Sequence, residues 1–239
     1  MSKQLGVLSR LKNDKKNMNK KNIVFGNING IRYGVLYTSV GIHDFNQIEE
    51  TAELNESVGS YIATIHNAWD SYDFGINRLN LDADLFIHRS MNAIRQFSTI
   101  YGCDIDFLEN VAKQVKNKLA SLSVEKPQYG LCHGDIYGGN MRVDADYNPI
   151  LFYFDFCGNG WRAYDISVYA FPFGMGSDVT KLKMREQRKN QFLEGYNKIR
   201  TMSEDEINSI PLFIPFRRIL ILGHYTFLFF LIRGETLQS

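Results

Sequence analysis

The chain has 239 residues, of which 44% are hydrophobic and 13% aromatic, so it can fill a sizeable core as one large domain or two small ones. Its formal net charge is +1, which gives no indication of a nucleic-acid or anionic membrane partner, and we expect neither. The three cysteines, Cys103, Cys132 and Cys157, form no C-x-x-C pair. An odd number without metal spacing fits a reducing cytosol better than a disulfide framework.

Two segments of the chain bear on its localisation. Residues 1–22 are polar and Lys-rich, which is not the apolar pattern of a signal peptide. The apolar stretch 219–232 is shorter than the ~20 residues of a typical membrane span and predicts a buried helix. We therefore expect a cytoplasmic protein with no membrane partner; the sequence leaves its oligomeric state open.

The first predicted elements are two strands. The runs 23–26 and 31–37 are apolar and flank Asn27-Ile28-Asn29-Gly30, a pattern typical of a β-hairpin. The next segment, 38–41, is a plausible hinge, so we divide the chain into a first part, 1–41, and a second part, 42–239.

The second part is mainly helical. Leu54, Val58, Ile62 and Ile65 recur every three or four residues and predict a helix over 50–68. The same kind of pattern predicts further helices over 82–98, 104–122, 165–172, 178–200, 204–209 and 211–233. Two strands, 141–143 and 150–156, are expected around the turn 144–149. A hairpin followed by helices and short strands gives an α+β fold.

Residues 131–140 carry the strongest functional signal. They contain His133, Asp135 and Asn140 in the order H-x-D-x-x-x-x-N, the spacing of the kinase catalytic loop. Asp135 could orient and deprotonate a substrate hydroxyl, and Asn140 offers an amide oxygen suited to Mg²⁺. His133 would brace the loop. Asp155, in Phe-Tyr-Phe-Asp-Phe-Cys-Gly, is a candidate second metal ligand.

Two other interpretations of this segment stand beside the kinase loop: a structural turn and the active site of a hydrolase. Clusters of Asp, Gly and Asn often mark turns without any catalytic role. Asp135 and His133 could also form the proton-transfer pair of a hydrolase, although the chain contains no G-x-S-x-G element and no His cluster with metal spacing.

Two blocks resemble the aminoglycoside phosphotransferase and choline kinase superfamily of small-molecule kinases. Residues 131–140 resemble its H-G-D-x-x-x-x-N loop, and 152–166 resemble its block I-D-F-D-x-C-G-x-G-x-R-x-Y-D-L. The helix ending Ala63-Thr64-Ile65-His66 also resembles the family, and the similarity covers about 23–235. It implies a two-lobed, protein-kinase-like fold, ATP as phosphoryl donor, Mg²⁺, and a small acceptor that carries a hydroxyl group.

The resemblance also implies roles for single residues. Asp135 would be the catalytic base and Asn140 a Mg²⁺ ligand. His133, in the catalytic loop, and Asp155, as second metal ligand, stay candidates from their positions in the sequence. Ser39, Val40 and Gly41 would form the hinge whose backbone contacts adenine. Arg162, Asp165 and His66 would be structural.

Two departures from the family pattern matter. A gapless alignment places Tyr153, not Asp155, at the position of the family's metal-binding Asp, and a protonated phenol is a poor Mg²⁺ ligand. If 150–156 is a strand, Tyr153 and Asp155 lie on one face, and substitution by Asp155 is conceivable. In addition, no G-x-G-x-x-G or V-A-I-K-like run precedes the hairpin. We therefore expect a residual N-lobe hairpin and hinge in 1–41 and a helical C-lobe in 42–239.

Two functions follow from these observations. The first is an ATP-dependent phosphotransferase acting on a hydroxyl of a small molecule. The alternative is a degenerate, non-catalytic, pseudokinase-like module that binds a ligand or partner. The sequence does not identify the acceptor.

Overall fold

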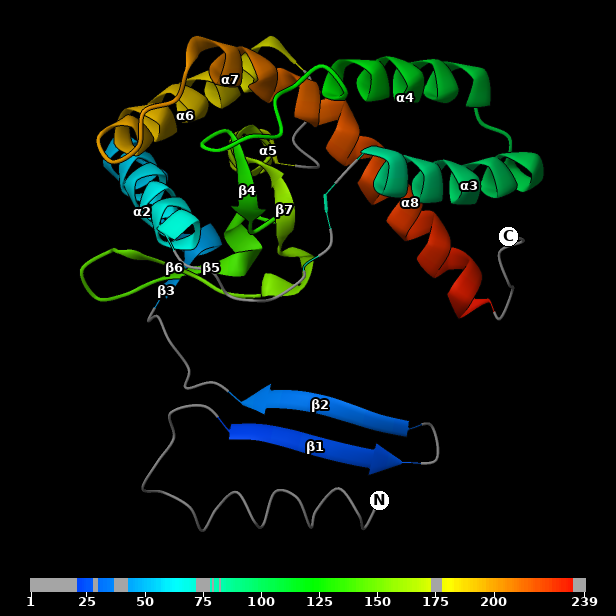
Figure 1. Ribbon diagram of the computed structural model, residues 1–239, viewed down its shortest axis with the longest axis horizontal. Coiled ribbons are helices and arrows are strands. Elements are labelled where there is room, and N and C mark those ends of the chain that lie inside the picture. Colours follow the sequence, from blue (N-terminus) through cyan, green and yellow to red (C-terminus); the bar gives the residue numbers. More distant parts are fainter. Residues whose placement is uncertain are drawn as a thin grey trace. The chain divides into compact units, whose positions relative to one another are not determined.

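The computed structural model describes residues 21–27, 30–36, 43–71, 78, 80–81, 83–172 and 178–233 (Figure 1). Contacts within the chain divide it into two compact units, 1–41 and 42–239. The first unit contains an antiparallel pair of strands, β1 (Lys21–Asn27) and β2 (Gly30–Leu36), with Lys21 opposite Leu36 and Asn27 opposite Gly30. This pairing confirms the predicted hairpin. The predicted hinge residues Ser39, Val40 and Gly41 lie outside the described residues.

The second unit is mainly helical, as predicted, and its helices follow the expected ranges closely. They are α2 (Ala52–Ser71), α3 (Ala83–Tyr101), α4 (Ile105–Leu119), α5 (Arg162–Ala170), α6 (Val179–Asn197), α7 (Glu204–Ser209) and α8 (Phe213–Ile232). Single 3-10 turns occur at η1 (Phe45–Gln47), η2 (Gly138–Asn140), η3 (Phe154–Phe156) and η4 (Ile210–Leu212). Together with the short strands, these elements make an α+β fold.

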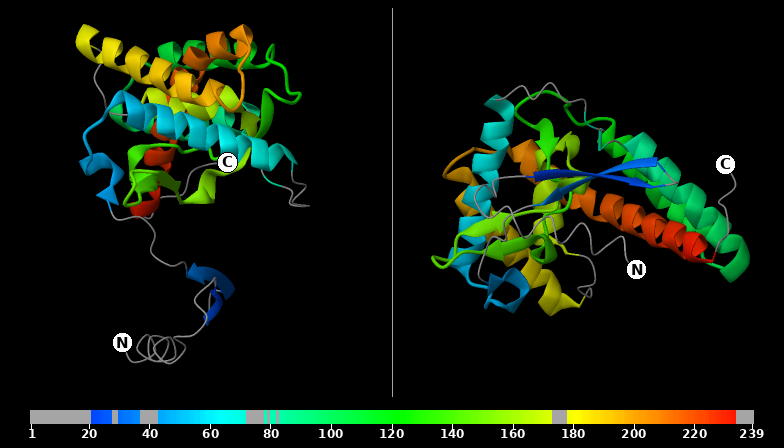
Figure 2. Two further views of the ribbon diagram at one scale, coloured as in Figure 1. Left: turned by 90° about the vertical axis from the view of Figure 1, so that its left-hand side faces the viewer. Right: turned by 90° about the horizontal axis from the view of Figure 1, so that it is seen from below.

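Two small antiparallel sheets lie among these helices. One has the order β3-β5-β6, from β3 (His43–Asp44), β5 (Met141–Val143) and β6 (Pro149–Leu151). The other pairs β4 (Tyr129–Cys132) with β7 (Gly158–Trp161), and the sequence patterns did not predict this pair. β4 and β7 lie between α2 on one side and α8 on the other (Figures 1 and 2). The segment 131–140 therefore starts inside a sheet that is held between helices.

The helices pack in close pairs, α2 with α6 and α3 with α8 (Figure 2). Glycine allows the first pair to approach closely, because a Cβ atom on Gly195 would lie only 1.9 Å from the carbonyl oxygen of Glu56. The second pair meets in the same way, where a Cβ atom on Gly223 would lie 2.4 Å from the Cα of Ser90. These contacts fix the backbones of both pairs.

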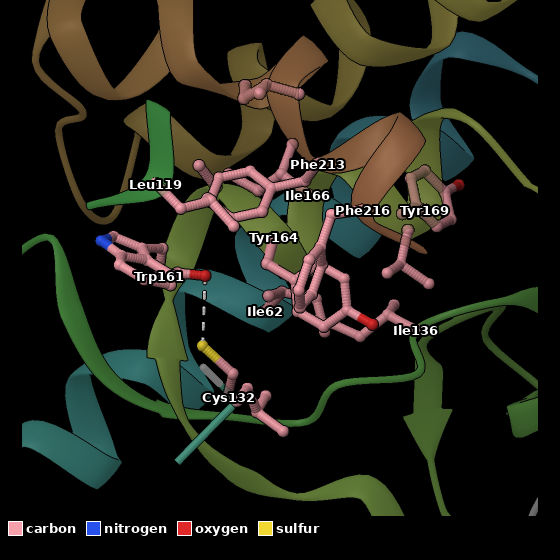
Figure 3. Packing of buried hydrophobic residues seen from close by; sticks show 14 of the residues in the cluster. Ile62, Leu119, Cys132, Ile136, Trp161, Tyr164, Ile166, Tyr169, Phe213 and Phe216 are labelled. Atoms are coloured by element: carbon pink, nitrogen blue, oxygen red, sulfur yellow. Dashed lines mark hydrogen bonds between the residues drawn. The ribbon is translucent and has the colours of Figure 1, made fainter. Parts of the chain in front are cut away.

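The core of the second unit consists of aliphatic and aromatic side chains packed from helices and loop together (Figure 3). Its fully or almost fully buried members include Ile62, Leu119, Ile136, Ile166, Phe213 and Phe216. Burial of each such side chain contributes roughly 1.5–3 kcal/mol to folding. Ile136 belongs to the candidate catalytic loop, so core packing fixes that loop directly.

The predicted strand 150–156 is wrong beyond Leu151. β6 ends there, Tyr153 has left-handed backbone angles (φ 69°, ψ 64°), and Asp155 lies in the 3-10 turn η3. Tyr153 and Asp155 therefore do not lie on a strand, and the expectation that their side chains share one strand face is wrong. The aromatic run 152–156 suited a strand by composition, but its backbone turns back onto residues 133–134.

The apolar stretch near the C-terminus is only partly buried. Residues Glu204–Ile232 are long and apolar enough to span a membrane by length and composition alone, with 28% of the most apolar window buried. Core helices of soluble proteins also meet this criterion. Phe213, Phe216 and Ile219 of α8 are buried in the core, whereas Leu231 and Ile232 are exposed. The predicted buried helix is thus buried along one face.

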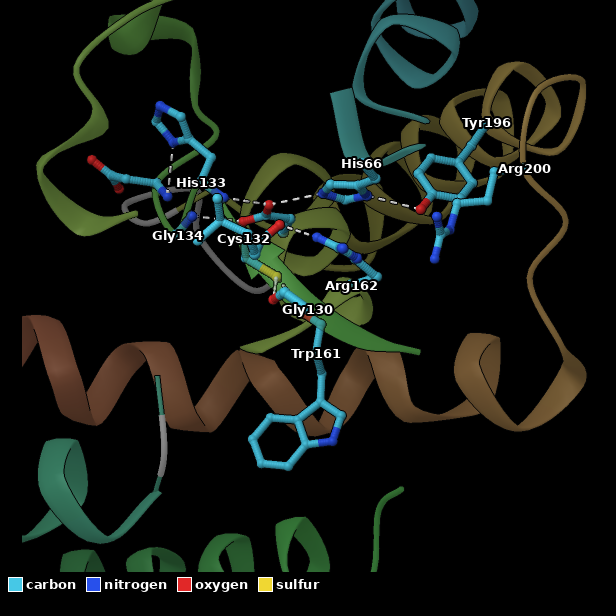
Figure 4. Close-up of polar contacts among 12 residues, drawn as sticks. His66, Gly130, Cys132, His133, Gly134, Trp161, Arg162, Tyr196 and Arg200 are labelled. Carbon is cyan, nitrogen blue, oxygen red and sulfur yellow. Dashed lines mark hydrogen bonds and ion pairs between the residues drawn. The ribbon is translucent and has the colours of Figure 1, made fainter. Parts of the chain in front are cut away.

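A buried polar network joins α2, α5 and α6 (Figure 4). His66 Nε2 donates to Asp165 Oδ2 at 3.1 Å, and His66 Nδ1 accepts from the hydroxyl of Tyr196 at 2.8 Å. Burial lowers the pKa of His66 to about 4, so the imidazole is neutral near pH 7. Burial opposes ionisation of Asp165, but the hydrogen bonds from His66 and Gly134 and the nearby imidazoles of His66 and His133 together outweigh it, and the pKa of Asp165 is lowered.

This network predicts acid sensitivity. The unfolded chain protonates His66 near pH 6.5, whereas the folded protein does so only near pH 4. The contribution of His66 to the free energy of unfolding is therefore present above pH 6.5 and falls by about 3 kcal/mol as the pH is lowered to 4. This change in the free energy of unfolding is measured by urea unfolding of the wild type and of His66→Gln at several pH values. His66→Gln should have a flatter pH dependence in this window, and the exposed control His88→Gln should keep the wild-type slope. Equal slopes in all three proteins would contradict the assignment.

Candidate active site

The carboxylate of Asp165 holds the start of the candidate catalytic loop. Its Oδ1 accepts the backbone N–H of Gly134 at 2.7 Å, and its Oδ2 accepts the backbone N–H of His133 at 2.8 Å. Gly134 has φ 81°, and a Cβ atom there would lie 2.4 Å from the carbonyl oxygen of Phe156. Glycine is therefore required at this position on both conformational and steric grounds.

Two arginines, Arg162 and Arg200, extend this support away from the loop (Figure 4). The guanidinium of Arg162 donates to the carbonyl of Leu131 and, at 2.6 Å, to Asp70 Oδ1. Arg200 donates to the other oxygen of Asp70, also at 2.6 Å. These contacts agree with the bracing roles expected of Arg162 and Asp165, because they tie β4 to α2 and to the end of α6.

His133 is fully buried and both of its ring nitrogens are engaged. Nε2 donates to the carbonyl of Phe152 at 3.1 Å, and Nδ1 accepts the backbone N–H of Asp135 at 3.2 Å. The ring also packs against that of Phe154, with centroids 4.8 Å apart. A histidine in this setting holds the loop in shape and has no free nitrogen for proton transfer. The geometry gives no support to a hydrolase in which His133 and Asp135 act as a pair.

The carboxylate of Asp135 has a partner on each oxygen. Oδ2 accepts from Asn140 Nδ2 at 2.7 Å, and Oδ1 is paired with the guanidinium of Arg217 from α8. Arg217 also donates to the hydroxyl of Tyr164 at 3.2 Å and to the carbonyl of Gly134 at 3.3 Å. Burial lowers the pKa of Arg217, but its interactions with Tyr164 and Asp135 together outweigh this effect and raise the pKa above its usual value, so the guanidinium stays charged.

Arg217 was not among the site residues predicted from the sequence. The signal available was that Arg217 and Arg218 are the only charged residues in the apolar stretch 211–232. A charge in such a stretch indicates a specific partner, because an unpaired buried charge is strongly unfavourable. The pattern could not say which carboxylate that partner is.

The predicted metal ligands lie on two segments that pack together. Asn140 uses its amide nitrogen for Asp135, at 2.7 Å, which turns its amide oxygen away from that carboxylate. Asp155 is exposed on η3, whose neighbouring residues Phe154 and Phe156 contact His133 and Gly134. An amide oxygen and a carboxylate are oxygen ligands that suit Mg²⁺. Tyr153 is 58% exposed and offers only a phenol.

A second group with metal-binding side chains is structural. His66, Cys132 and Asp165 place their ligand atoms within 4.8 Å of one another, and all three are buried. Both nitrogens of His66 are used in hydrogen bonds. Burial raises the pKa of Cys132 well above its usual value, so the thiol stays protonated, and it donates to the carbonyl of Trp161 at 3.3 Å. This group is a hydrogen-bonded part of the core.

A cavity of about 650 Å³ lies against Asp135. Asp135, Tyr137 and Phe156 line it from the loop side. The facing walls come from α3 and α8, including Phe86, Arg89, Arg217, Leu220, His224 and Phe227. This volume suits a small organic ligand, and its position brings such a ligand to the Asp135 carboxylate.

Comparison with known proteins gives one family. A model described as "Phosphotransferase enzyme family" matches residues 26–200. An uncharacterized protein of Synechocystis sp. is 27% identical over 156 residues, which are 64% of this chain and 41% of that protein. An uncharacterized protein of Deinococcus radiodurans is 28% identical over 168 residues, 69% of this chain and 47% of that protein. The chain thus spans less than half the length of these two curated relatives.

Solved structures show the same fold. An amicoumacin kinase in complex with AMP-PNP and Ca²⁺ has a TM-score of 0.70 at 20% identity, covering 99% of this chain and 71% of that one. A microcompartment-associated aminopropanol kinase has a TM-score of 0.68 at 19% identity, covering 93% and 71%. A Plasmodium vivax ethanolamine kinase has a TM-score of 0.57 at 17% identity, covering 100% and 67%. The predicted kinase-like α+β fold is confirmed. Because the family model covers well over half of its residues, the chain belongs to the phosphotransferase enzyme family.

Proposed function

We propose that the protein transfers the γ-phosphoryl group of ATP to a hydroxyl of a small molecule bound beside Asp135. The observation that carries this proposal is the loop 133–140, which is fixed by Asp165 and presents Asp135 to a cavity of about 650 Å³. Family membership and the kinase-like fold support the same reaction class.

Asp135 can act on a hydroxyl while it keeps its present partners. A carboxylate oxygen has about two acceptor sites, so Oδ2 can hold Asn140 and still accept a substrate O–H. Arg217 and Asn140 then fix the direction of the carboxylate. The acceptor oxygen forms a bond to the γ-phosphorus, the bond from that phosphorus to the β-γ bridging oxygen breaks, ADP leaves, and Asp135 takes the hydroxyl proton.

Asn140 and Asp155 are the residues that would hold Mg²⁺. When bound, the ion neutralises charge that develops on the phosphate oxygens. Ser39, Val40 and Gly41, at the boundary between the two units, are the proposed contacts to adenine, on the family resemblance alone. Cytoplasmic localisation belongs to the same proposal.

The catalytic role of Asp135 has a direct test. Asp135→Asn keeps the size of the side chain but removes the proton acceptor, so phosphoryl transfer should fall by about 10²–10⁴-fold. Transfer to a panel of small alcohols is measured with radiolabelled ATP and Mg²⁺. Asp146→Asn, in the exposed turn between β5 and β6, is the matched control and should retain activity. Full activity in Asp135→Asn would show that Asp135 is not the base.

A second candidate function is a non-catalytic module that binds a ligand without phosphorylating it. The observation in its favour is Tyr153, which stands at the family's metal position, is exposed and has left-handed backbone angles. A phenol there cannot replace a carboxylate near neutral pH. The two functions therefore differ in whether Asp155 serves as the metal ligand.

Binding of Mg²⁺–ATP separates the two candidates. In the catalytic case Asp155→Asn should weaken Mg²⁺-dependent ATP binding tenfold or more, because loss of even an outer-shell partner typically costs about 10–100-fold. Tyr153→Phe, which removes only the phenolic hydroxyl, should bind as the wild type does. Titration calorimetry of the full chain measures both. A folded wild type that binds no Mg²⁺–ATP would favour the non-catalytic module.

A further inference from the structure

The charged side chains that line the cavity beside Asp135 do not favour a polycationic acceptor, which would need free carboxylates. Among the described residues that line it, Asp135 is the only carboxylate, and it is already paired with Arg217. A second guanidinium, that of Arg89 on α3, also lines the cavity, together with the imidazole of His224. An ammonium group entering here would lose water and meet no free carboxylate.

Arg89 is placed to bind a ligand rather than to stabilise the fold. It is exposed, and no hydrogen bond or ion pair joins it to another described residue. Its backbone is nevertheless well fixed, because the next residue, Ser90, packs against Gly223 of α8. The Arg89 guanidinium on this fixed backbone offers paired N–H donors that match a carboxylate or another oxyanion.

The rest of the cavity is suited to an apolar body. Phe86 comes from α3, Phe156 from η3, and Leu220, Ile221 and Phe227 from α8. These side chains line the same cavity as Asp135 and Arg89. A ligand that reaches both would carry a hydroxyl and an oxyanion on a compact hydrophobic scaffold.

We infer that the acceptor is an alcohol with an anionic carboxylate group, a hydroxy acid with an apolar scaffold, whose carboxylate is bound by Arg89 and whose hydroxyl faces Asp135. That this ligand is a phosphoryl acceptor rests on the proposed function, whereas its chemical class is inferred from the cavity alone. It separates this protein from the aminopropanol and ethanolamine kinases, whose named ligands carry amino groups.

The test uses matched alcohols that differ only in charge. The probes are 4-(hydroxymethyl)benzoate, 4-(hydroxymethyl)benzamide and 4-(aminomethyl)benzyl alcohol, together with aliphatic hydroxy acids and their amide and amine counterparts. Binding to the full chain is measured by calorimetry without nucleotide, so the readout does not depend on phosphoryl transfer. Arg89→Gln removes the proposed anchor. Arg95→Gln is the control, because Arg95 lies on the same helix and pairs with Glu109 away from the cavity.

The acids should bind about tenfold or more tightly than their amides and amines, since hydrogen bonds to charged groups contribute about 1.5–3 kcal/mol. Arg89→Gln should remove this preference, and Arg95→Gln should keep it. Amines that bind as tightly as the acids, absence of binding by every acid, or an unchanged preference in Arg89→Gln would overturn the inference.

Phosphoryl transfer measured on the same probes distinguishes this inference from the proposed function. Acid binding that requires Arg89, without any transfer from Mg²⁺–ATP, would overturn the proposed function and leave the ligand class intact. Transfer to the amines in preference to the acids would support the proposed function and overturn the ligand class.

Discussion

The site depends on one buried carboxylate. Asp165 receives the backbone N–H groups of His133 and Gly134 and the imidazole of His66, so a single side chain of α5 connects the loop to α2. Buried backbone donors must be satisfied, and a charged acceptor satisfies two of them here. Without it, the turn at Gly134 would leave donors unpaired in the core. The position of Asp135, one residue further on, follows from this arrangement.

Electrostatic pairing continues from this anchor into the cavity. Asp135 shares its carboxylate between Asn140 and Arg217, which come from the end of the loop and from α8. The pair is 14% exposed on each side chain, so water screens it only partly. This leaves Asp135 oriented and neutralised, and among the described residues that line the cavity it leaves the guanidinium of Arg89 without a charged partner. The same contact therefore governs both the proposed chemistry and the proposed choice of acceptor.

Periodic elements could be predicted because their signals are local. The helix α2 follows from the spacing of Leu54, Val58 and Ile62, and the hairpin follows from two apolar runs around an Asn-Gly turn. Such patterns depend on neighbours within a few residues. The strand predicted over 152–156 was wrong for the opposite reason. Its aromatic residues suit a strand, but packing of Phe154 on His133 and of Phe156 on Gly134 turns the backbone. Tertiary contacts of this kind override local propensity.

The sequence by itself determined the family, the kinase-like α+β fold and the identity of the loop 133–140, since the spacing of His133, Asp135 and Asn140 reflects a local turn. Only the tertiary structure decided what surrounds Asp135. Arg217 is 82 residues away along the chain and reaches the carboxylate because α8 packs beside α5 and α3. The charge of the cavity and the place of Asp155 on a turn against the loop are likewise products of packing. Interactions between distant segments leave little trace in the order of residues, because they depend on how the helices pack.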